Sequence, residues 1–282
     1  MMKFKGNIFT LEISPPKGVK YEEILKDLKP YKDFFFFINT TDNQRANVRM
    51  SSLSMSILLK CSGFNPNMQI TARDRNILAI QSDILGAYAL GIRYFTAMTG
   101  DHPALGDHKN AFPVYEVDSL GILKILKNLK QGLLLNGKKI DTCLKDIVYG
   151  AVYNPYSGPK ELQEKKLEKK INLGASFIQT QPVYSLKVAN YTYKLIKKFG
   201  AYPILGILAI NSKRMLEFID ELLPGALEED LKKEFLKSSN IKETYFEYLK
   251  DFLKSFKGKN VGFHFMFFKD LDKLTKLLEE IF

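Results

Sequence analysis

The sequence predicts an α/β protein built as a (βα)8 barrel, with extra helices before its last strand. Short apolar runs alternate with longer amphipathic stretches, and this alternation predicts a parallel sheet whose strands are connected by helices. Eight such units fit into 282 residues, a length at which α/β barrels form one domain. No linker, low-complexity tract or clear repeat interrupts the chain, so we expect one domain over residues 1–282. A doubly wound open sheet is the alternative.

The strands are predicted from apolar runs of strand length that are bounded by turn-forming residues. These runs are Phe9–Ile13, Phe34–Asn39, Met68–Thr71, Tyr94–Met98, Ile147–Val152, Phe177–Gln179, Ile204–Leu208 and Val261–Met266. A helical apolar pattern follows each strand or its connection. These patterns cover Tyr21–Leu28, Arg45–Cys61, Asn76–Leu90, Leu120–Lys130, Pro159–Asn172, Leu186–Phe199, Lys213–Leu222 and Leu271–Ile281.

Two segments depart from the minimal barrel. Gly132–Cys143 contains the hairpin signal Asn136-Gly137 and predicts an excursion at the amino-terminal face, away from the expected site. Glu228–Ser238 and Ile241–Phe256 predict two further helices, which begin after Pro224-Gly225. We expect these helices either to cover the barrel or to form a subunit interface.

The charge of the chain favours small anionic ligands over nucleic acid. Lys and Arg total 42 against 31 Asp and Glu, a net charge of +11. Most of this excess is lysine scattered along predicted helices, which is typical of solvated helix faces and attracts anions in general. A basic nucleic-acid-binding barrel rests on net charge alone, because clusters of arginine with aromatic residues are missing. We therefore expect no nucleic-acid partner.

The cysteine, histidine and terminal patterns indicate a cytoplasmic protein without a metal. Cys61 and Cys143 are far apart and form no CxxC pattern, so neither a disulfide framework nor a cysteine metal site is expected. His102, His108 and His264 show no ligand spacing. The N-terminal MMKFKGN runs directly into a predicted strand and leaves no room for a signal peptide, and no apolar run has the ~20 residues of a membrane span.

The loop Thr99–His108, TGDHPALGDH, is the most informative segment. It follows a predicted strand and contains two Gly-Asp pairs. Gly100 and Gly106 permit backbone conformations that other residues avoid, and a proline between them stiffens the turn. The loop is therefore suited to hold Asp101 and Asp107 near a ligand. An ordinary βα turn whose aspartate caps the next helix is the alternative.

Other polar residues lie where the predicted strands end, and in a barrel this edge carries the chemistry. Glu12 points to the opposite strand face from Phe9 and Leu11, and a carboxyl group beside an apolar wall can act as a general acid. An edge glutamate paired with lysine is the structural alternative. Gln179 and Gln181 lie on one side of their strand if it continues, and such a pair can recognise a heterocycle.

These motifs together resemble one known family. The segments that carry the resemblance, in order and at compatible spacing, are FTLEISPPKG, TTDNQRA, TARDRN, QSDILGAYALGI, TGDHPALGDH, PVYEVDS, AVYNPYS, LEKKINLGASFIQTQPVY and PILGIL. The combination is similar to methylenetetrahydrofolate reductase of the short, catalytic-domain-only type. It covers almost the whole chain, and it implies a single flavin-binding (βα)8 barrel domain that binds FAD.

The resemblance also implies roles for individual residues. Glu12 matches the glutamate that protonates the folate and helps to open its five-membered ring to an iminium cation. Asp101 matches the aspartate that influences the flavin and the folate, and Gln181 matches the glutamine that binds the pterin. The positions at or beside the FAD sites are Thr41, Gln69, Gly100, Asp101, Tyr115, Asp118, Asn154, Lys166, Lys169 and Lys170.

The implied reaction is the reduction of 5,10-methylenetetrahydrofolate to 5-methyltetrahydrofolate, a step of one-carbon metabolism and methionine biosynthesis, with NADH or NADPH as donor. Three positions depart from the family pattern: Thr99 replaces an arginine, Gln69 a histidine, and Lys213 an aromatic residue that stacks on nicotinamide and folate. The last change favours an alternative, a folate- or flavin-binding subunit that receives electrons from a partner protein. We expect a homo-oligomer or a complex subunit.

Overall fold

The computed structural model describes residues 4–282, and its strands form a closed parallel barrel in the order β1 to β8. The predicted (βα)8 barrel is confirmed, and the doubly wound open sheet is wrong because β8 closes the strand order. The strands are β1 Ile8–Ile13, β2 Phe37–Thr40, β3 Pro66–Thr71, β4 Tyr94–Met98, β5 Val148–Tyr153, β6 Phe177–Pro182, β7 Tyr202–Leu208 and β8 Gly262–Met266.

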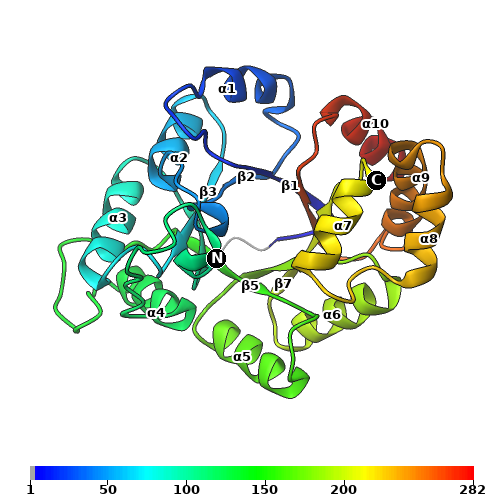
Figure 1. The fold of residues 1–282 in the computed structure, drawn as a ribbon. Helices are drawn as coiled ribbons and strands as arrows, with labels where there is room; N and C mark the ends of the chain where they lie inside the picture. The colour runs from blue at the N-terminus through cyan, green and yellow to red at the C-terminus, as the bar shows by residue number, and fades with distance from the viewer. Residues whose placement is uncertain (1–3) are drawn as a thin grey trace. The chain divides into compact units, whose positions relative to one another are not determined.

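Helices alternate with the strands along the chain (Figure 1). They are α1 Glu22–Leu28, α2 Ser52–Cys61, α3 Ile77–Ala89, α4 Ser119–Lys130, α5 Lys160–Asn172, α6 Leu186–Lys198, α7 Lys213–Leu222, α8 Glu229–Lys237, α9 Ile241–Lys254 and α10 Leu271–Ile281. Short 3-10 turns occur at Lys29–Tyr31, Gln44–Ala46 and Pro103–Leu105. Among the helices formed by residues 4–282, none combines the length and the apolar character that a membrane crossing requires.

The contacts of the chain gather in two compact units. The first comprises Thr10–Val152 and Glu168–Phe177, and the second comprises Phe4–Phe9, Tyr153–Leu167 and Ile178–Phe282. Each unit is described by itself below. The single domain over residues 1–282 stays a prediction.

In the first unit, β2, β3 and β4 pair in parallel and are covered by helices. Helix α2 packs against β2 and β3, and α2 also contacts α3, which lies beside it in Figure 1. At the start of the strands the rings of Phe37, Tyr94 and Phe177 meet, with centroids 5.5 Å apart in the Phe37–Tyr94 pair and in the Phe37–Phe177 pair. Gly150 is required here, because a Cβ would lie 2.4 Å from the Phe177 ring. This apolar layer supports the polar strand ends above it.

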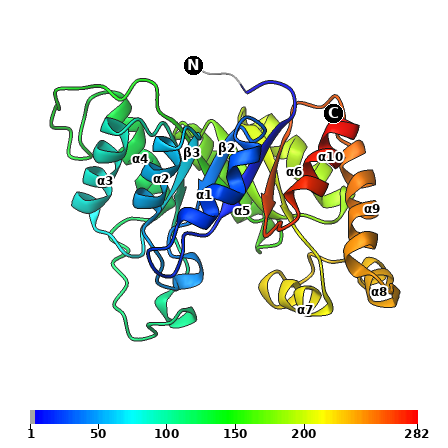
Figure 2. The same ribbon diagram turned by 90° about the horizontal axis from the view of Figure 1, so that it is seen from above.

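In the second unit, the two predicted extra helices pack on the neighbouring elements. Helix α9 contacts both α8 and α10, and Figure 2 shows these three helices next to one another. The ring of Phe256 lies 6.0 Å from that of Phe263 in β8, and the Tyr245 hydroxyl donates to the Leu208 carbonyl of β7 at 3.0 Å. Helix α9 and the residues after it therefore pack on β7 and β8, which is one of the two roles expected for the extra helices; a role in a subunit interface stays a prediction.

Several predicted boundaries differ from those of the structure, and a local cause is evident for two of them. Strand β2 begins at Phe37 rather than Phe34, because the preceding phenylalanines lie in a turn in which the Phe34 amide donates to the Tyr31 carbonyl. The helix predicted from Arg45 begins only at Ser52, because Ser51 caps it and the preceding residues leave helical geometry. Strand β6 continues to Pro182, three residues beyond its predicted end at Gln179.

The excursion predicted before β5 forms a small antiparallel turn. Leu133 bridges Lys139, and the Leu134 amide donates to the Lys138 carbonyl at 2.8 Å. Gly137 has a φ of +85°, a left-handed conformation that favours glycine. The hairpin signal at Asn136-Gly137 is thereby confirmed.

Candidate functional site

Glu12 lies near the carboxyl end of β1, on the face that it shares with buried polar side chains. It is half-buried and stands in register with Asn39 of β2, which stands in register with Asn67 of β3. Asn67 donates to Asn39 Oδ1 at 2.6 Å and to Thr96 Oγ1 at 2.8 Å. The carboxyl group of Glu12 therefore lies on the polar face of these strands, opposite to Leu11.

A glutamine from the next loop holds the Glu12 carboxyl group. Gln44 Nε2 donates to Glu12 Oε1 at 3.2 Å, and Ser14 Oγ donates to Gln44 Oε1 at 2.9 Å. Three residues around Gln44 have left-handed backbone: Asn43 at φ +45°, Arg45 at +55° and Ala46 at +56°. Non-glycine residues in this region cost conformational energy and persist only where surrounding contacts hold them.

A buried ion pair joins the loops that follow β2 and β3. The Asp42 side chain is 0% exposed and accepts from the two terminal nitrogens of Arg75, Nη1 at 2.7 Å and Nη2 at 3.1 Å. It also accepts from the amide and the hydroxyl of Thr71, at 2.9 and 2.8 Å. Burial alone would lower the pKa of Arg75, but the charges of Asp42 and Asp83 raise it above its ordinary value.

A second buried arginine connects three loops at the same edge. Arg73 is 2% exposed and forms a two-pronged ion pair with Asp74, at 2.7 and 2.6 Å. It also donates to the carbonyls of Asn43 and Asp101, at 3.2 and 3.3 Å. Burial acts to lower the pKa of Arg73, yet Asp74 raises it; burial acts to raise the pKa of Asp74, yet Arg73 lowers it.

The loop after β4 is held by its neighbours, which contact the side chain of one of its two aspartates. Gly100 has a φ of +90°, and its carbonyl accepts from the Tyr115 hydroxyl at 3.2 Å. Asp107 accepts from the Val48 amide at 3.0 Å, whereas the Asp101 side chain is exposed and its backbone is fixed through the arginine described above. The loop therefore presents one carboxylate to solvent from a fixed backbone.

Sequence analysis assigned no role to Asp42, Gln44, Arg73 or Arg75, although they lie in the segments TTDNQRA and TARDRN that carry the family resemblance. The signal was present: an aspartate directly after an apolar strand, and two arginines that flank an aspartate in the loop after the next strand. Because carboxyl ends of adjacent parallel strands meet at one edge, opposite charges there are expected to pair.

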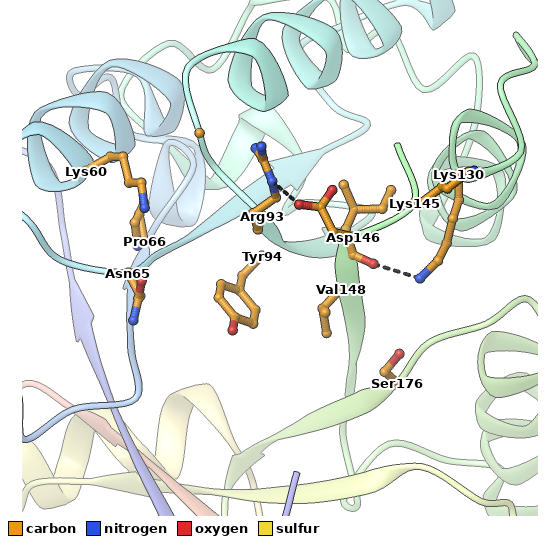
Figure 3. Close-up of a pocket in the computed structure, with 12 residues that line it drawn as sticks. Lys60, Asn65, Pro66, Arg93, Tyr94, Lys130, Lys145, Asp146, Val148 and Ser176 are labelled. Atoms are coloured by element: carbon orange, nitrogen blue, oxygen red, sulfur yellow. Dashed lines mark hydrogen bonds and ion pairs between the residues drawn. The ribbon is translucent and has the colours of Figure 1, made fainter. Parts of the chain in front are cut away.

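The opposite, amino-terminal edge of β3, β4 and β5 contains a hollow of about 470 Å³ (Figure 3). Three of its charged side chains, those of Arg93, Lys130 and Asp146, are engaged in contacts within the protein. Arg93 Nε pairs with Asp146 at 2.6 Å, and Lys130 Nζ donates to the Ile147 carbonyl at 2.8 Å. Tyr88 also donates to Asp146, at 2.7 Å. None of the predicted site residues of the first unit lines this hollow. Its internal contacts hold the starts of the strands in place.

The sequence profile of the methylenetetrahydrofolate reductase family matches residues 2–281. The chain belongs to this family. The match covers almost every residue, so the resemblance predicted from the motifs is confirmed. A comparison with curated protein sequences finds no significant match.

Solved structures share the fold at low sequence identity. An uncharacterized protein from Clostridium thermocellum that binds two copies of 5-methyl-5,6,7,8-tetrahydrofolic acid has a TM-score of 0.67 and 16% identity, over 99% of this chain and 96% of that chain. EDTA monooxygenase from Chelativorans sp. BNC1 has a TM-score of 0.58 and 10% identity, over 98% and 94%. The tryptophan synthase α-subunit from Pyrococcus furiosus has a TM-score of 0.52 and 10% identity, over 98% of this chain and 92% of that chain.

Two predicted FAD contacts of this reductase-family chain are buried at the ends of β2 and β3. Thr41 is 1% exposed, and its hydroxyl has no hydrogen-bond partner within residues 4–282. Gln69 is 6% exposed, and its backbone carbonyl accepts from Ser52. A buried hydroxyl without a partner is costly unless a ligand satisfies it. Thr41 therefore fits a polar cofactor.

Other predicted FAD contacts already have structural partners. Asp118 caps α4 by accepting from the Leu120 and Gly121 amides, at 2.9 and 3.0 Å. Thr99, which replaces the family arginine, accepts from the Ser119 amide at 3.3 Å and supports the same helix start. In α5, Lys170 donates to the Val152 carbonyl at 2.7 Å, and Lys169 is exposed.

Three predicted residues belong to the second unit. Asn154 accepts from the Tyr156 amide at 2.9 Å, and Lys166 is exposed on α5. Gln181 is half-buried in β6, where strand geometry places it on the same side as Gln179, as predicted. Its carbonyl accepts from Thr180, whose hydroxyl also accepts from the Gly206 amide at 2.8 Å.

Proposed function

We propose that the chain is a flavin-dependent 5,10-methylenetetrahydrofolate reductase that forms 5-methyltetrahydrofolate. The observation that carries the proposal is the half-buried carboxyl group of Glu12. It is fixed by Gln44 at the strand edge where the loop of Asp101 is also anchored. The family match over residues 2–281 supports a folate substrate, and the 5-methyl-5,6,7,8-tetrahydrofolic acid that the Clostridium thermocellum protein binds agrees with it.

The FAD of the proposed reaction fits the residues of the chain. Two observations support this fit: the buried Thr41 hydroxyl after β2 has no partner within residues 4–282, and the left-handed Gly100 after β4 has no side chain to exclude a ligand. We propose that these residues hold FAD together with Gln69, Tyr115, Asp118, Lys169 and Lys170 of the first unit. For Asn154 and Lys166 of the second unit, we propose an FAD contact on the family resemblance alone. When bound, FAD carries the hydride between donor and folate. The lysines supply positive charge for its pyrophosphate.

Glu12 supplies the proton of the reaction. Protonation of the folate nitrogen breaks its bond to the one-carbon bridge, and the five-membered ring opens to an iminium cation. Addition of a hydride to the bridge carbon then gives the methyl group, so one proton and one hydride balance the reaction. Asp101 places a negative charge in the site, which stabilises the developing cation. Gln181 recognises the donor and acceptor groups of the pterin.

An absorption spectrum of the purified chain tests this function. We expect flavin bands when FAD is bound, bleaching of these bands by NADH or NADPH, and return of the bands when 5,10-methylenetetrahydrofolate is added. Formation of 5-methyltetrahydrofolate in the same reaction identifies the product. A chain that binds no FAD, or that keeps reduced flavin in the presence of the folate, contradicts the proposal.

A second candidate function follows from Lys213. This lysine is exposed at the first turn of α7, at the position where the resemblance implies an aromatic residue that stacks on nicotinamide. A chain without this contact would serve as a flavin- and folate-binding subunit that is reduced by a partner protein. Flavin that bleaches with an artificial electron donor but not with NADH or NADPH favours this version; bleaching by either nucleotide rules it out.

A further inference from the structure

The 3-10 turn Gln44–Ala46 lies between two features of the proposed site. On one side Gln44 contacts Glu12, and on the other side the turn packs against the loop Thr99–His108. The turn has no role in the proposed binding of FAD or folate. We propose that Gln44 is a positioning residue for Glu12 and that the loop Thr99–His108 sets its placement. This inference rests on the proposed function, in which Glu12 donates the proton.

The hydrogen bonds fix the direction in which the Gln44 amide points. The Ser14 hydroxyl donates to Gln44 Oε1 at 2.9 Å, so the amide oxygen is occupied and the amide nitrogen faces Glu12. This nitrogen then donates to Glu12 Oε1 at 3.2 Å. A glutamine held at both ends restricts the rotation of the carboxyl group that it contacts. The orientation of the proton donor is thereby set before the substrate binds.

The turn adopts a costly backbone conformation, which requires outside support. Arg45 and Ala46 have positive φ, and so does Asn43 just before the turn. Asn47 ends the turn, with its amide donating to the Gln44 carbonyl at 3.2 Å and its side chain donating to the Arg45 carbonyl at 3.0 Å. These local bonds hold the end of the turn but do not fix its position relative to Glu12.

The loop after β4 supplies that position through three contacts. Gly106 lies so close to the turn that a Cβ would be 1.9 Å from the Ala46 carbonyl oxygen. Asp107 accepts from the Val48 amide at 3.0 Å. Arg73 donates to the carbonyls of both Asn43 and Asp101. The loop that carries Asp101 therefore also holds the turn that carries Gln44, so both carboxylates of the proposed reaction share one support.

The experiment compares two variants in which one glutamine is replaced by methionine, which has similar length but no hydrogen-bond donor. Q44M removes the contact with Glu12. Q81M is the matched control, because Gln81 also makes two hydrogen bonds, to the Ile77 carbonyl and from the Leu135 amide. Both variants are assayed as full chains for FAD binding, flavin reduction by the donor, and kcat and KM for the folate.

We expect Q44M to lower kcat for the folate by about 10- to 100-fold, since small misplacement of a reacting group has effects of this size. Its KM, FAD binding and flavin reduction should stay within about twofold of the wild-type values, as should every parameter of Q81M. In a double-mutant cycle, Q44M should cause no further loss once Glu12 is replaced in E12Q.

Three kinetic results overturn the inference: an unchanged kcat in Q44M, an equal loss in Q81M, or independent losses in the E12Q/Q44M double variant. Failure of the proposed function is distinct, because it is seen as absent folate turnover in the wild type or full turnover in E12Q. Crystal structures of the wild type and Q44M give a readout that needs no activity. A Glu12 carboxyl group that keeps its orientation in Q44M also overturns the positioning role.

Discussion

The two edges of the strands in the first unit both contain arginine–carboxylate pairs, yet they differ in what surrounds them. At the amino-terminal edge, the side chains of Arg93 and Asp146 are partly exposed, and Arg93 also donates to the backbone carbonyl of Tyr88. At the carboxyl-terminal edge, the buried Asp42–Arg75 pair lies next to a turn with left-handed residues and a carboxyl group held by Gln44. Charge alone therefore does not mark the site. The carboxyl-terminal edge differs in its left-handed backbone and in the hydrogen bonds that converge on the carboxyl group of Glu12.

The largest expected effect separates the two edges by chemistry. Replacing Glu12 with glutamine removes the proton but keeps the size of the side chain. We expect E12Q to lower folate turnover by about 10²- to 10⁴-fold, the usual contribution of general acid–base catalysis, with FAD binding and flavin reduction unchanged. Stopped-flow measurement of the two half-reactions checks this expectation. The control D146N alters the other edge and should turn over at the wild-type rate; equal losses in both variants would show that the edges do not differ.

The next effect separates the edges by stability. D42A leaves Arg75 buried and keeps only its contact with Asp83, so we expect a loss of about 3 kcal/mol in the free energy of unfolding. D146A breaks a pair in which Asp146 is 58% exposed, so we expect at most about 1 kcal/mol. Urea unfolding of the wild type, D42A and D146A measures the two losses in the free energy of unfolding. Similar losses would mean that burial does not distinguish these pairs.

The sequence predicted the fold better than it predicted the difference between the two strand edges. Alternation of apolar runs and amphipathic stretches was sufficient for the barrel, because each strand and helix carries its own periodic signal. Glu12, Thr41 and Asp101 could be named as candidate site residues because they lie within segments that resemble the family, and their roles stay predictions. Gln44 was missed because its importance depends on left-handed backbone at Arg45, where the sequence pattern predicted a helix. Contacts between loops that are distant in the chain leave no periodic signal.

A third effect tests whether the loop after β4 supports the site. In G106A the added methyl group would displace Ala46, whose carbonyl oxygen lies 1.9 Å from the expected Cβ position. We expect kcat for the folate to fall by about 10- to 100-fold, as in Q44M, through the same turn. G86A is the control, because Gly86 lies in α3 with open space around its Cβ position. Steady-state kinetics of both variants measure this effect. A wild-type kcat in G106A would show that the loop after β4 does not hold the turn Gln44–Ala46 in place.

The smallest effect concerns pH. Burial acts to raise the pKa of Asp74, but its hydrogen bond and charge contact with Arg73 lower the pKa below the ordinary value of 3.8. Because the folded state lowers this pKa, the pair stabilises the fold above about pH 4, and the stabilisation is lost as the pH falls through the folded-state pKa.

The variant D74N removes the titrating group. The wild type should therefore be more stable than D74N at pH 7, and the difference between their urea midpoints should narrow as the pH falls below about 4 and through the lowered pKa of Asp74. A difference that is independent of pH would assign the role of Asp74 to hydrogen bonding alone, and the ionic contact that anchors Arg73 beside Asn43 and Asp101 would then contribute nothing to this edge.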